Sequence, residues 1–374
     1  MLHKSHRIPA LLAAGALMLS LNSCGLMEMR DSYVETEAGE DSAGMMLAPA
    51  ERVNQIIERP AVETDVPQTT EPRKDVKIVL AGDALIDTAI VKDAADRAYD
   101  GQSYSFLTMY TGIYGSISGG DASLMSFSTA DGLSDKPEQT PPVEAAAALS
   151  DLGVDILDIT GSDSSEAEKH GMTELNGAED TVETVEAGDM TLAFTALDGN
   201  DYAQYTVDDD ALAEIREADR TADVVIVSVT WNENTGLDEM RTVAAALADA
   251  GADVVAGKGR GIGAVEWIDS GDGTKTLAAY SLGTVLSTSD KTAGLLGGVL
   301  SFTVDPDGAL LNPVLEPTFT HYTAEYRDYQ VFRLAEYSEE LAASHANSGV
   351  STSVLRDIVR GTVPAEFLPA AIRG

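Results

Sequence analysis

The stretch VVIVSVTWN, residues 224–232, decides the fold class of this 374-residue chain. Its first part is β-branched and apolar apart from one serine, and the polar cluster Thr230-Trp231-Asn232 follows at once. Near-continuous apolar runs of this length are typical of strands that are buried on both faces. Three further runs have the same design, at residues 76–80 before Ala81-Gly82-Asp83, at residues 154–159 before Thr160-Gly161-Ser162-Asp163, and at residues 252–256 before Gly257-Lys258-Gly259-Arg260-Gly261.

Helical patterns lie between these predicted strands, at residues 141–152, 208–219 and 237–250. Two of them end just before a glycine, Gly153 or Gly251, which is the usual residue past the end of a helix. Strands that alternate with helices predict an α/β sheet whose ligands bind at the carboxyl ends of the strands. We therefore expect the four polar clusters to converge at one edge.

The second half of the chain predicts more β-structure. Apolar runs at residues 277–282 and 299–304 lead into the turn Asp305-Pro306-Asp307-Gly308, which favours a second, more antiparallel sheet. Helical patterns follow at residues 337–346 and 351–359. They predict a C-terminal helical extension over residues 321–374.

The N-terminus has the parts of a secretory signal sequence. A short basic segment precedes an apolar run at residues 8–21, which is too short to span a bilayer as a permanent helix. Leu21-Asn22-Ser23-Cys24 resembles the lipobox of bacterial lipoproteins, and Cys24 is the only cysteine. We predict a lipoprotein signal peptide over residues 1–24 and a lipid anchor at Cys24 on the outer face of the bacterial cytoplasmic membrane. The alternative is an ordinary signal peptide with an incidental cysteine.

Charge and composition restrict the partners. Residues 25–74 are acidic and lack a lasting hydrophobic period, which predicts a disordered tether. The whole chain has 62 acidic against 24 basic residues, a net charge of -38. Such a surface repels nucleic acid and anionic lipid headgroups, so nucleic acid is not expected as a partner.

Several of these segments, in this order, resemble the capsule synthesis protein A family of poly-γ-glutamate synthesis, a branch of the calcineurin-like metallophosphoesterases. Within the predicted domain, residues 75–320, the resemblance implies two mixed β-sheets packed face to face with helices outside. The matching segments are residues 77–83, 145–158, 223–231, 245–257 with Ala264-Val265-Glu266-Trp267, Tyr280-Ser281-Leu282-Gly283-Thr284 and Glu316-Pro317-Thr318.

The chain departs from the family at its metal ligands. Asp83 matches an acidic ligand, whereas the positions of the family's Asn, Glu and His ligands carry other residues. A dinuclear site needs several His and carboxylate ligands to hold metals about 3.5–4 Å apart, so catalysis by the usual route is not expected. Asp83, Asp163 and Glu233 remain as weak candidates for Ca²⁺ or Mg²⁺, or as solvated loop acids. The replaced motifs read Ser126-Phe127-Ser128, Gly161-Ser162-Asp163, Thr230-Trp231-Asn232 and Gly257-Lys258-Gly259-Arg260-Gly261.

These residues favour a non-catalytic lipoprotein that binds or scaffolds an extracellular polymer or a small anion. Lys258 and Arg260 would supply positive charge where the resemblance implies metals, and Trp231 would form an apolar wall. The candidate ligand-binding residues are Asp83, Asp163, Thr230, Trp231, Lys258 and Arg260. Three alternatives stay open: the two basic residues only neutralise Asp83 and Asp163; the protein is a metal-dependent hydrolase or transferase of a capsule or cell-wall polymer; or it is a structural envelope protein without a ligand.

Overall fold

The computed structural model describes residues 73–129, 142–161, 167–177, 182–199, 206–232, 234–259, 261–271 and 273–374. All of them belong to one compact unit, Gln68–Gly374. The predicted signal peptide, Cys24 and most of the predicted tether lie outside the described residues. In the described part, no helix has the length and apolar character to cross a membrane.

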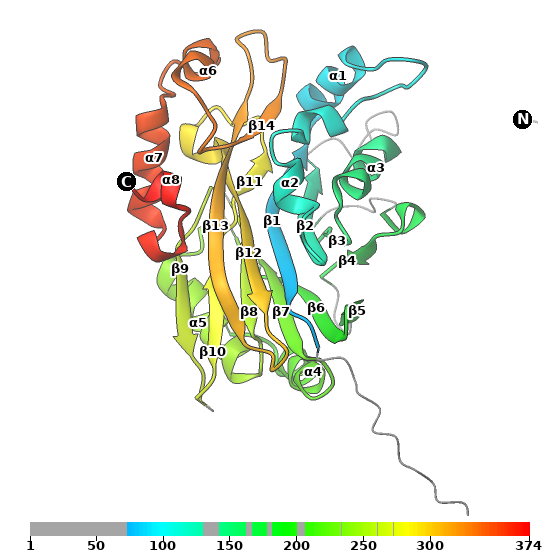
Figure 1. Cartoon of the computed structure of the whole chain (residues 1–374), viewed down its shortest axis with the longest axis vertical. Helices are drawn as coiled ribbons and strands as arrows, with labels where there is room; N and C mark the ends of the chain where they lie inside the picture. The colour runs from blue at the N-terminus through cyan, green and yellow to red at the C-terminus, as the bar shows by residue number, and fades with distance from the viewer. Residues whose placement is uncertain are drawn as a thin grey trace, which may run out of the picture. The chain divides into compact units, whose positions relative to one another are not determined.

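The larger of two mixed sheets has eight strands (Figure 1). Its order is β14-β13-β12-β1-β2-β3-β4, and β11 also pairs with β1. Strands β1 to β4 run parallel, while β12, β13 and β14 are antiparallel to their neighbours. The strands are β1 (Val76–Ile86), β2 (Ala122–Thr129), β3 (Ile156–Asp158), β4 (Thr173–Leu175), β11 (Thr284–Leu286), β12 (Leu296–Val304), β13 (Leu310–His321) and β14 (Gln330–Arg333).

The smaller sheet has six strands in the order β5-β6-β7-β8-β10-β9. Its central strands β6, β7, β8 and β10 run parallel, and an antiparallel strand closes each edge. The strands are β5 (Glu183–Ala187), β6 (Met190–Asp198), β7 (Val224–Thr230), β8 (Val254–Lys258), β9 (Val265–Asp269) and β10 (Lys275–Ala279).

Helices flank both sheets. In Figure 1, α1 to α3 lie on one flank of the eight-stranded sheet and α6 to α8 on the other, while α4 and α5 pack against the six-stranded sheet. The helices are α1 (Thr88–Asp96), α2 (Tyr114–Ile117), α3 (Val143–Leu152), α4 (Asp209–Asp219), α5 (Leu237–Asp249), α6 (Glu339–Ser344), α7 (Thr352–Thr362) and α8 (Ala370–Arg373), with short 3₁₀ turns η1 (Leu107–Tyr110), η3 (Ala167–His170), η5 (Thr292–Leu295) and η6 (Ala365–Phe367).

The position of β7 explains why residues 224–230 are almost entirely apolar. Val225, Val227 and Val229 belong to the apolar cluster under α4 and α5. Val224 and Ile226 belong instead to the cluster that joins the two sheets. Because successive side chains of a strand point to opposite faces, a strand between a helical layer and a second sheet is apolar at nearly every position. The predicted architecture of two mixed sheets packed face to face is confirmed.

Aspartates order the starts of the parallel strands. In each of four cases, a carboxylate directly before a strand accepts a hydrogen bond from the backbone N–H of the second residue of the neighbouring strand. Part of the acidity of the chain therefore serves strand register. The pairs are Asp121 with Lys77 (2.8 Å), Asp155 with Ser123 (2.9 Å), Asp223 with Thr191 (2.9 Å) and Asp253 with Val225 (2.8 Å).

The distribution of strands between the sheets differs from the residue-based prediction. The four early apolar runs divide between the sheets, with β1 and β3 in the larger one and β7 and β8 in the smaller one. The two later runs do not form a sheet of their own, because β10 pairs with β8 and β12 pairs with β1. The segment after residue 320 is also not wholly helical, since β14 joins the edge of the larger sheet. Hydrophobic periodicity reports burial and does not encode which strand is the partner.

Candidate functional site

The carboxyl ends of strands from both sheets meet at one cavity of about 600 Å³, which we call the strand-end cavity. Four of the predicted ligand-binding residues line it: Asp83, Thr230, Trp231 and Lys258. The predicted convergence is therefore confirmed for three of the four polar clusters, whereas no described residue of the cluster Thr160 to Asp163 lines the cavity. Asp163, Glu233 and Arg260 lie outside the described residues. The lining residues are Asp83, Leu85, Ser128, Thr129, Thr230, Trp231, Asn232, Thr235, Met240, Lys258, Gly259, Ser281 and Thr284.

Asp83 is placed by an irregularity in β1. The register with β2 shifts between Ala81 and Asp83, and the Asp83 N–H donates to the Gly283 carbonyl at 2.9 Å. Only glycine fits at position 82, because a Cβ there would lie 2.3 Å from the Leu282 carbonyl oxygen. The sequence Gly-Asp thus brings β1 against the segment before β11 and directs the carboxylate to the cavity.

The Asp83 carboxylate is almost completely buried, with 7% of the residue exposed. Its Oδ2 accepts a hydrogen bond from the Ser128 hydroxyl, and its Oδ1 has no partner within the described part of the chain. Burial raises the pKa of Asp83 above its usual range, the positive charge of Lys258 and the Ser128 bond oppose the shift, and the charge of Asp158 adds to it. The environment therefore favours the neutral acid more than water does.

Lys258 ends β8 and is buried as well, with 8% exposed. Its Nζ donates a hydrogen bond of 2.9 Å to the Thr160 carbonyl oxygen, beyond the end of β3. An ammonium has three donors, and this carbonyl takes one. Buried lysines are uncommon, and this one places a positive charge among carboxylates at the junction of the sheets.

A buried polar network behind the cavity includes residues that the sequence did not single out. Asp158 at the end of β3 is completely buried, and its Oδ2 accepts a 2.6 Å hydrogen bond from the Ser228 hydroxyl of β7. Its Oδ1 accepts a 2.9 Å hydrogen bond from the Thr160 N–H, and Ser126 lies 3.5 Å from Oδ2. The signal available in the sequence was a carboxylate at the end of the apolar pair Ile156-Leu157 and a serine inside the apolar run at residues 224–229. The Asp158–Ser228 bond joins the two sheets directly.

Trp231 forms an apolar wall of the cavity. Its indole Nε1 donates to the Tyr280 carbonyl oxygen at 2.7 Å, which fixes the ring. Gly257 makes this possible, since a Cβ there would lie 1.9 Å from the same oxygen and 2.2 Å from Nε1. Next to the ring, the Thr230 Oγ1 is buried without a hydrogen-bond partner among the described residues.

The described part of the site does not fit the two-metal centre that the resemblance implies. Among the described residues, no three His, Cys, Asp or Glu side chains are grouped so that they could hold a metal ion. The groups that act on Asp83 are the Ser128 hydroxyl, the Lys258 ammonium and the more distant charge of Asp158, and the ammonium repels a metal cation. The positive charge beside Asp83 thus comes from the side chain of Lys258. Weak binding of Ca²⁺ or Mg²⁺ through Asp83, Asp163 and Glu233 stays a prediction.

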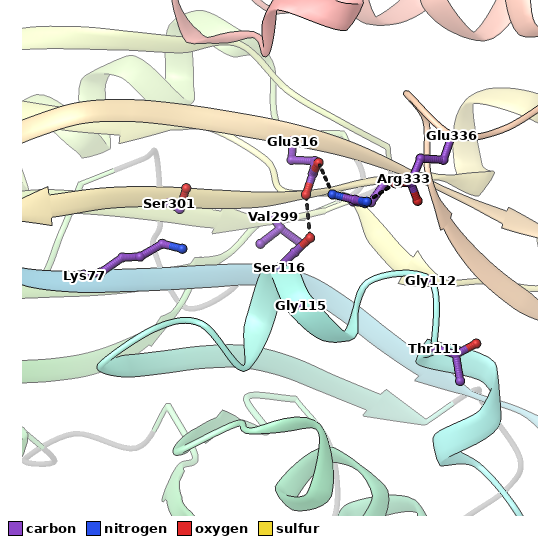
Figure 2. Close-up of a pocket in the computed structure, with 10 residues that line it drawn as sticks. All are labelled: Lys77, Thr111, Gly112, Gly115, Ser116, Val299, Ser301, Glu316, Arg333 and Glu336. Carbon is purple, nitrogen blue, oxygen red and sulfur yellow. Dashed lines mark hydrogen bonds and ion pairs between the residues drawn. The ribbon is translucent and has the colours of Figure 1, made fainter.

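A separate cavity of about 470 Å³ lies beside α2, over β1, β12, β13 and β14 (Figure 2). Glu316 is central in it: its Oε2 accepts a hydrogen bond of 2.5 Å from Ser116, and its Oε1 lies 3.7 Å from the Arg333 guanidinium, which also pairs with Glu336. The Lys77 ammonium lines the same cavity and has no ion pair within the described part of the chain. Because most of its charged groups already pair with one another, this cavity is the weaker candidate for a ligand.

Over part of its length, the chain is similar to one family of bacterial proteins. The model of the bacterial capsule synthesis protein PGA_cap matches residues 160–289. A solved structure described as a novel phosphatase from Mycoplasma pneumoniae is 11% identical, with a TM-score of 0.43, and the match covers 66% of this chain and 94% of that one. A hypothetical protein from Thermus thermophilus is 14% identical with a TM-score of 0.43, and the match covers 64% and 98%. No curated protein matches the chain.

The matched segment, residues 160–289, contains Thr230, Trp231 and Lys258, whereas Asp83 precedes it. It also spans β7, β8 and β10, whose carboxyl ends border the strand-end cavity. The predicted resemblance is thus confirmed for residues 160–289, over which the chain matches the bacterial capsule synthesis protein family.

Proposed function

We propose that this protein is a cell-envelope lipoprotein that binds an acidic polymer or another anionic ligand in the strand-end cavity and does not hydrolyse it. The observation that carries the proposal is the buried Lys258 ammonium in a cavity at the carboxyl ends of strands from both sheets. The chain has a net charge of -38, and ligands of α/β sheets bind at the carboxyl ends of the strands. A buried cation at these strand ends therefore favours an anionic ligand.

The surrounding groups support an anion or an acceptor-rich ligand. Burial raises the pKa of Asp83, while the charge of Lys258 and the Ser128 hydrogen bond oppose this shift. The Asp83 Oδ1 and the Thr230 Oγ1 are buried without partners in the described part of the chain. Such orphaned groups cost about 1–3 kcal/mol each, which a ligand atom at the cavity wall can offset. Arg260, two residues after Lys258, is proposed as a second cation.

The test is a titration of inorganic phosphate, glutamate oligomers and acidic glycans into three forms of the protein by calorimetry. Wild type is expected to bind at least one of them, and Lys258→Met/Arg260→Ala to bind it at least about tenfold more weakly, since charged hydrogen bonds contribute about 1.5–3 kcal/mol. Lys77→Met is the matched control, because it removes a lysine from the other cavity. Equal binding by all forms, or none by wild type, means that Lys258 serves only the fold.

The competing function is a metal-dependent hydrolase or transferase of a capsule or cell-wall polymer. Stoichiometric Zn, Mn or Fe in the purified protein together with phosphodiesterase turnover would replace the binding proposal with this one. A protein that shows neither metal, turnover nor anion binding would be a purely structural envelope protein.

A further inference from the structure

Another cavity, of about 510 Å³, adjoins the strand-end cavity. It is distinct from the cavity beside α2 and is called the second cavity below. The two share Leu85 and Thr284 as lining residues, so they lie next to each other. Each has the volume of an ordinary small-molecule site. The second cavity is lined by Leu85, Thr284, Ser287, Thr288, Ser289, Asp290, Lys291, Ala293 and Gly294.

The wall of the second cavity is a loop that its own hydroxyls hold in place. The Ser287 hydroxyl donates to the Gly294 carbonyl at 2.8 Å, and the Thr288 hydroxyl donates to Asp87, which also caps the N-terminus of α1. From the other side, the Tyr322 hydroxyl donates to the Ser289 carbonyl at 3.0 Å. A loop tied at several points is preorganised, which lowers the entropy that binding must overcome.

Several polar groups in the two cavities remain for a ligand. Lys291 is exposed, and its ammonium has no ion pair among the described residues. Three half-buried threonines of the strand-end cavity, Thr129, Thr235 and Thr284, have hydroxyls without a hydrogen bond to the rest of the described structure. Each of the two cavities therefore has one lysine and one aspartate in its wall, Lys258 with Asp83 and Lys291 with Asp290. Thr284 lines both cavities, and the Trp231 ring lines the first one.

We propose that the two cavities form one groove for a linear acidic glycan, in which Trp231 and Thr230 contact one sugar unit and Lys291 pairs with the carboxylate of a later unit. This inference rests on the proposed anion binding in the strand-end cavity. Threonine hydroxyls both donate and accept, as sugar hydroxyls do, and the apolar C–H face of a sugar ring packs against an aromatic wall. A carboxylate-bearing polypeptide could also bond these hydroxyls through its backbone, but it has no apolar ring face to pack against Trp231, so the groove favours the glycan.

The experiment measures affinity against ligand length by calorimetry, with galacturonic acid, its dimer and longer oligogalacturonates. Affinity is expected to rise with length until the groove is filled. Lys291→Ala should weaken binding of the long oligomers about two- to fivefold and leave the monomer unchanged, and Lys291→Glu should weaken it further. Lys258→Met should weaken binding at every length, while Lys77→Met, outside the groove, should have no effect.

The outcomes separate this inference from the function on which it rests. Binding that depends on Lys258 but neither on length nor on Lys291 would overturn the groove and leave the strand-end site standing. Glutamate oligomers that bind as tightly as oligogalacturonates of equal charge would overturn the glycan assignment in favour of a polypeptide. Absence of binding by every anion would remove the proposed function itself.

Discussion

Lys258 and Thr160 join the two sheets at the strand-end cavity: Nζ of Lys258, at the end of β8, donates to the carbonyl oxygen of Thr160, beyond the end of β3, at 2.9 Å. Lys258 also lowers the pKa of Asp83, against the upward effect of burial. One side chain therefore satisfies a buried carbonyl group and compensates a buried carboxyl group. Its role in the fold can be measured apart from any ligand.

Lys258→Met keeps the aliphatic stem and removes the ammonium. We expect it to lower the free energy of unfolding by about 1–3 kcal/mol, because the Thr160 carbonyl loses its donor and Asp83 loses a compensating charge. Urea denaturation measures this change. Lys77→Met should alter the free energy by no more than about 0.5 kcal/mol. Equal stability of the two variants would mean that the bond to Thr160 contributes nothing to the fold.

Gly257→Ala should distort the cavity wall. The added Cβ would lie 1.9 Å from the Tyr280 carbonyl oxygen and 2.2 Å from the Trp231 Nε1, and neither can move without breaking their hydrogen bond. Overpacking of this kind costs about 1–3 kcal/mol, and the tryptophan emission should shift as the ring moves. Gly115→Ala is the matched control, since its Cβ would meet nothing within 4 Å. An unchanged emission and stability for Gly257→Ala would contradict the packing described here.

The sequence predicted the strand ends better than the sheets. The polar clusters after the apolar runs brought Asp83, Thr230, Trp231 and Lys258 to one cavity, as predicted. The predicted end of the first strand was wrong, because β1 continues through the buried Asp83 to Ile86. Which strands share a sheet depends on crossovers, which leave no periodic signal in the chain. The Asp158–Ser228 bond was missed for the same reason, since each residue has a partner from the other sheet.

The domain should fold without a metal ion. Asp83 is bonded by the Ser128 hydroxyl and compensated by the Lys258 ammonium, so we expect little folding free energy to depend on a cation. We expect the thermal midpoint to change by no more than about 2 °C after EDTA treatment. Addition of Zn²⁺, Mn²⁺ or Ca²⁺ to the treated protein is the control. A midpoint that falls by tens of degrees with EDTA and recovers with one of these ions would restore the metalloprotein interpretation.

Cys24→Ser should release the protein from the membrane. Acyl chains on Cys24 would supply the buried CH₂ groups that hold the protein, and serine cannot form the thioether. The measurement is partitioning into the detergent phase together with known lipoproteins. Ser23→Ala, which leaves the cysteine in place, is the control and should partition as wild type does. If Cys24→Ser stays in the detergent phase, the apolar run at residues 8–21 is the anchor and the lipobox interpretation is wrong.

Acid should destabilise the packing of the C-terminal segment through His321 and His345. The two rings lie 5.4 Å apart, and both residues are buried: His321 also packs against Phe332 and is hydrogen-bonded to Tyr337 at 2.9 Å. Burial first, and then the charge of His345, lowers the pKa of His321 to about 4, while Asp328 opposes the shift. Burial also lowers the pKa of His345, against two backbone hydrogen bonds.

The direction of this pH effect depends on whether the folded or the unfolded state binds the proton. Above the unfolded pKa of about 6.5, both states are neutral and the histidines cause no pH dependence. As the pH falls from about 6.5 to about 4, the unfolded chain protonates His321 and the folded one does not, so stability is lost by up to about 3 kcal/mol. Urea unfolding of wild type and of His321→Gln across this range isolates the effect from that of the carboxylates. The difference in unfolding free energy between the two proteins should shrink as the pH falls, and a constant difference would mean that His321 is protonated equally in both states.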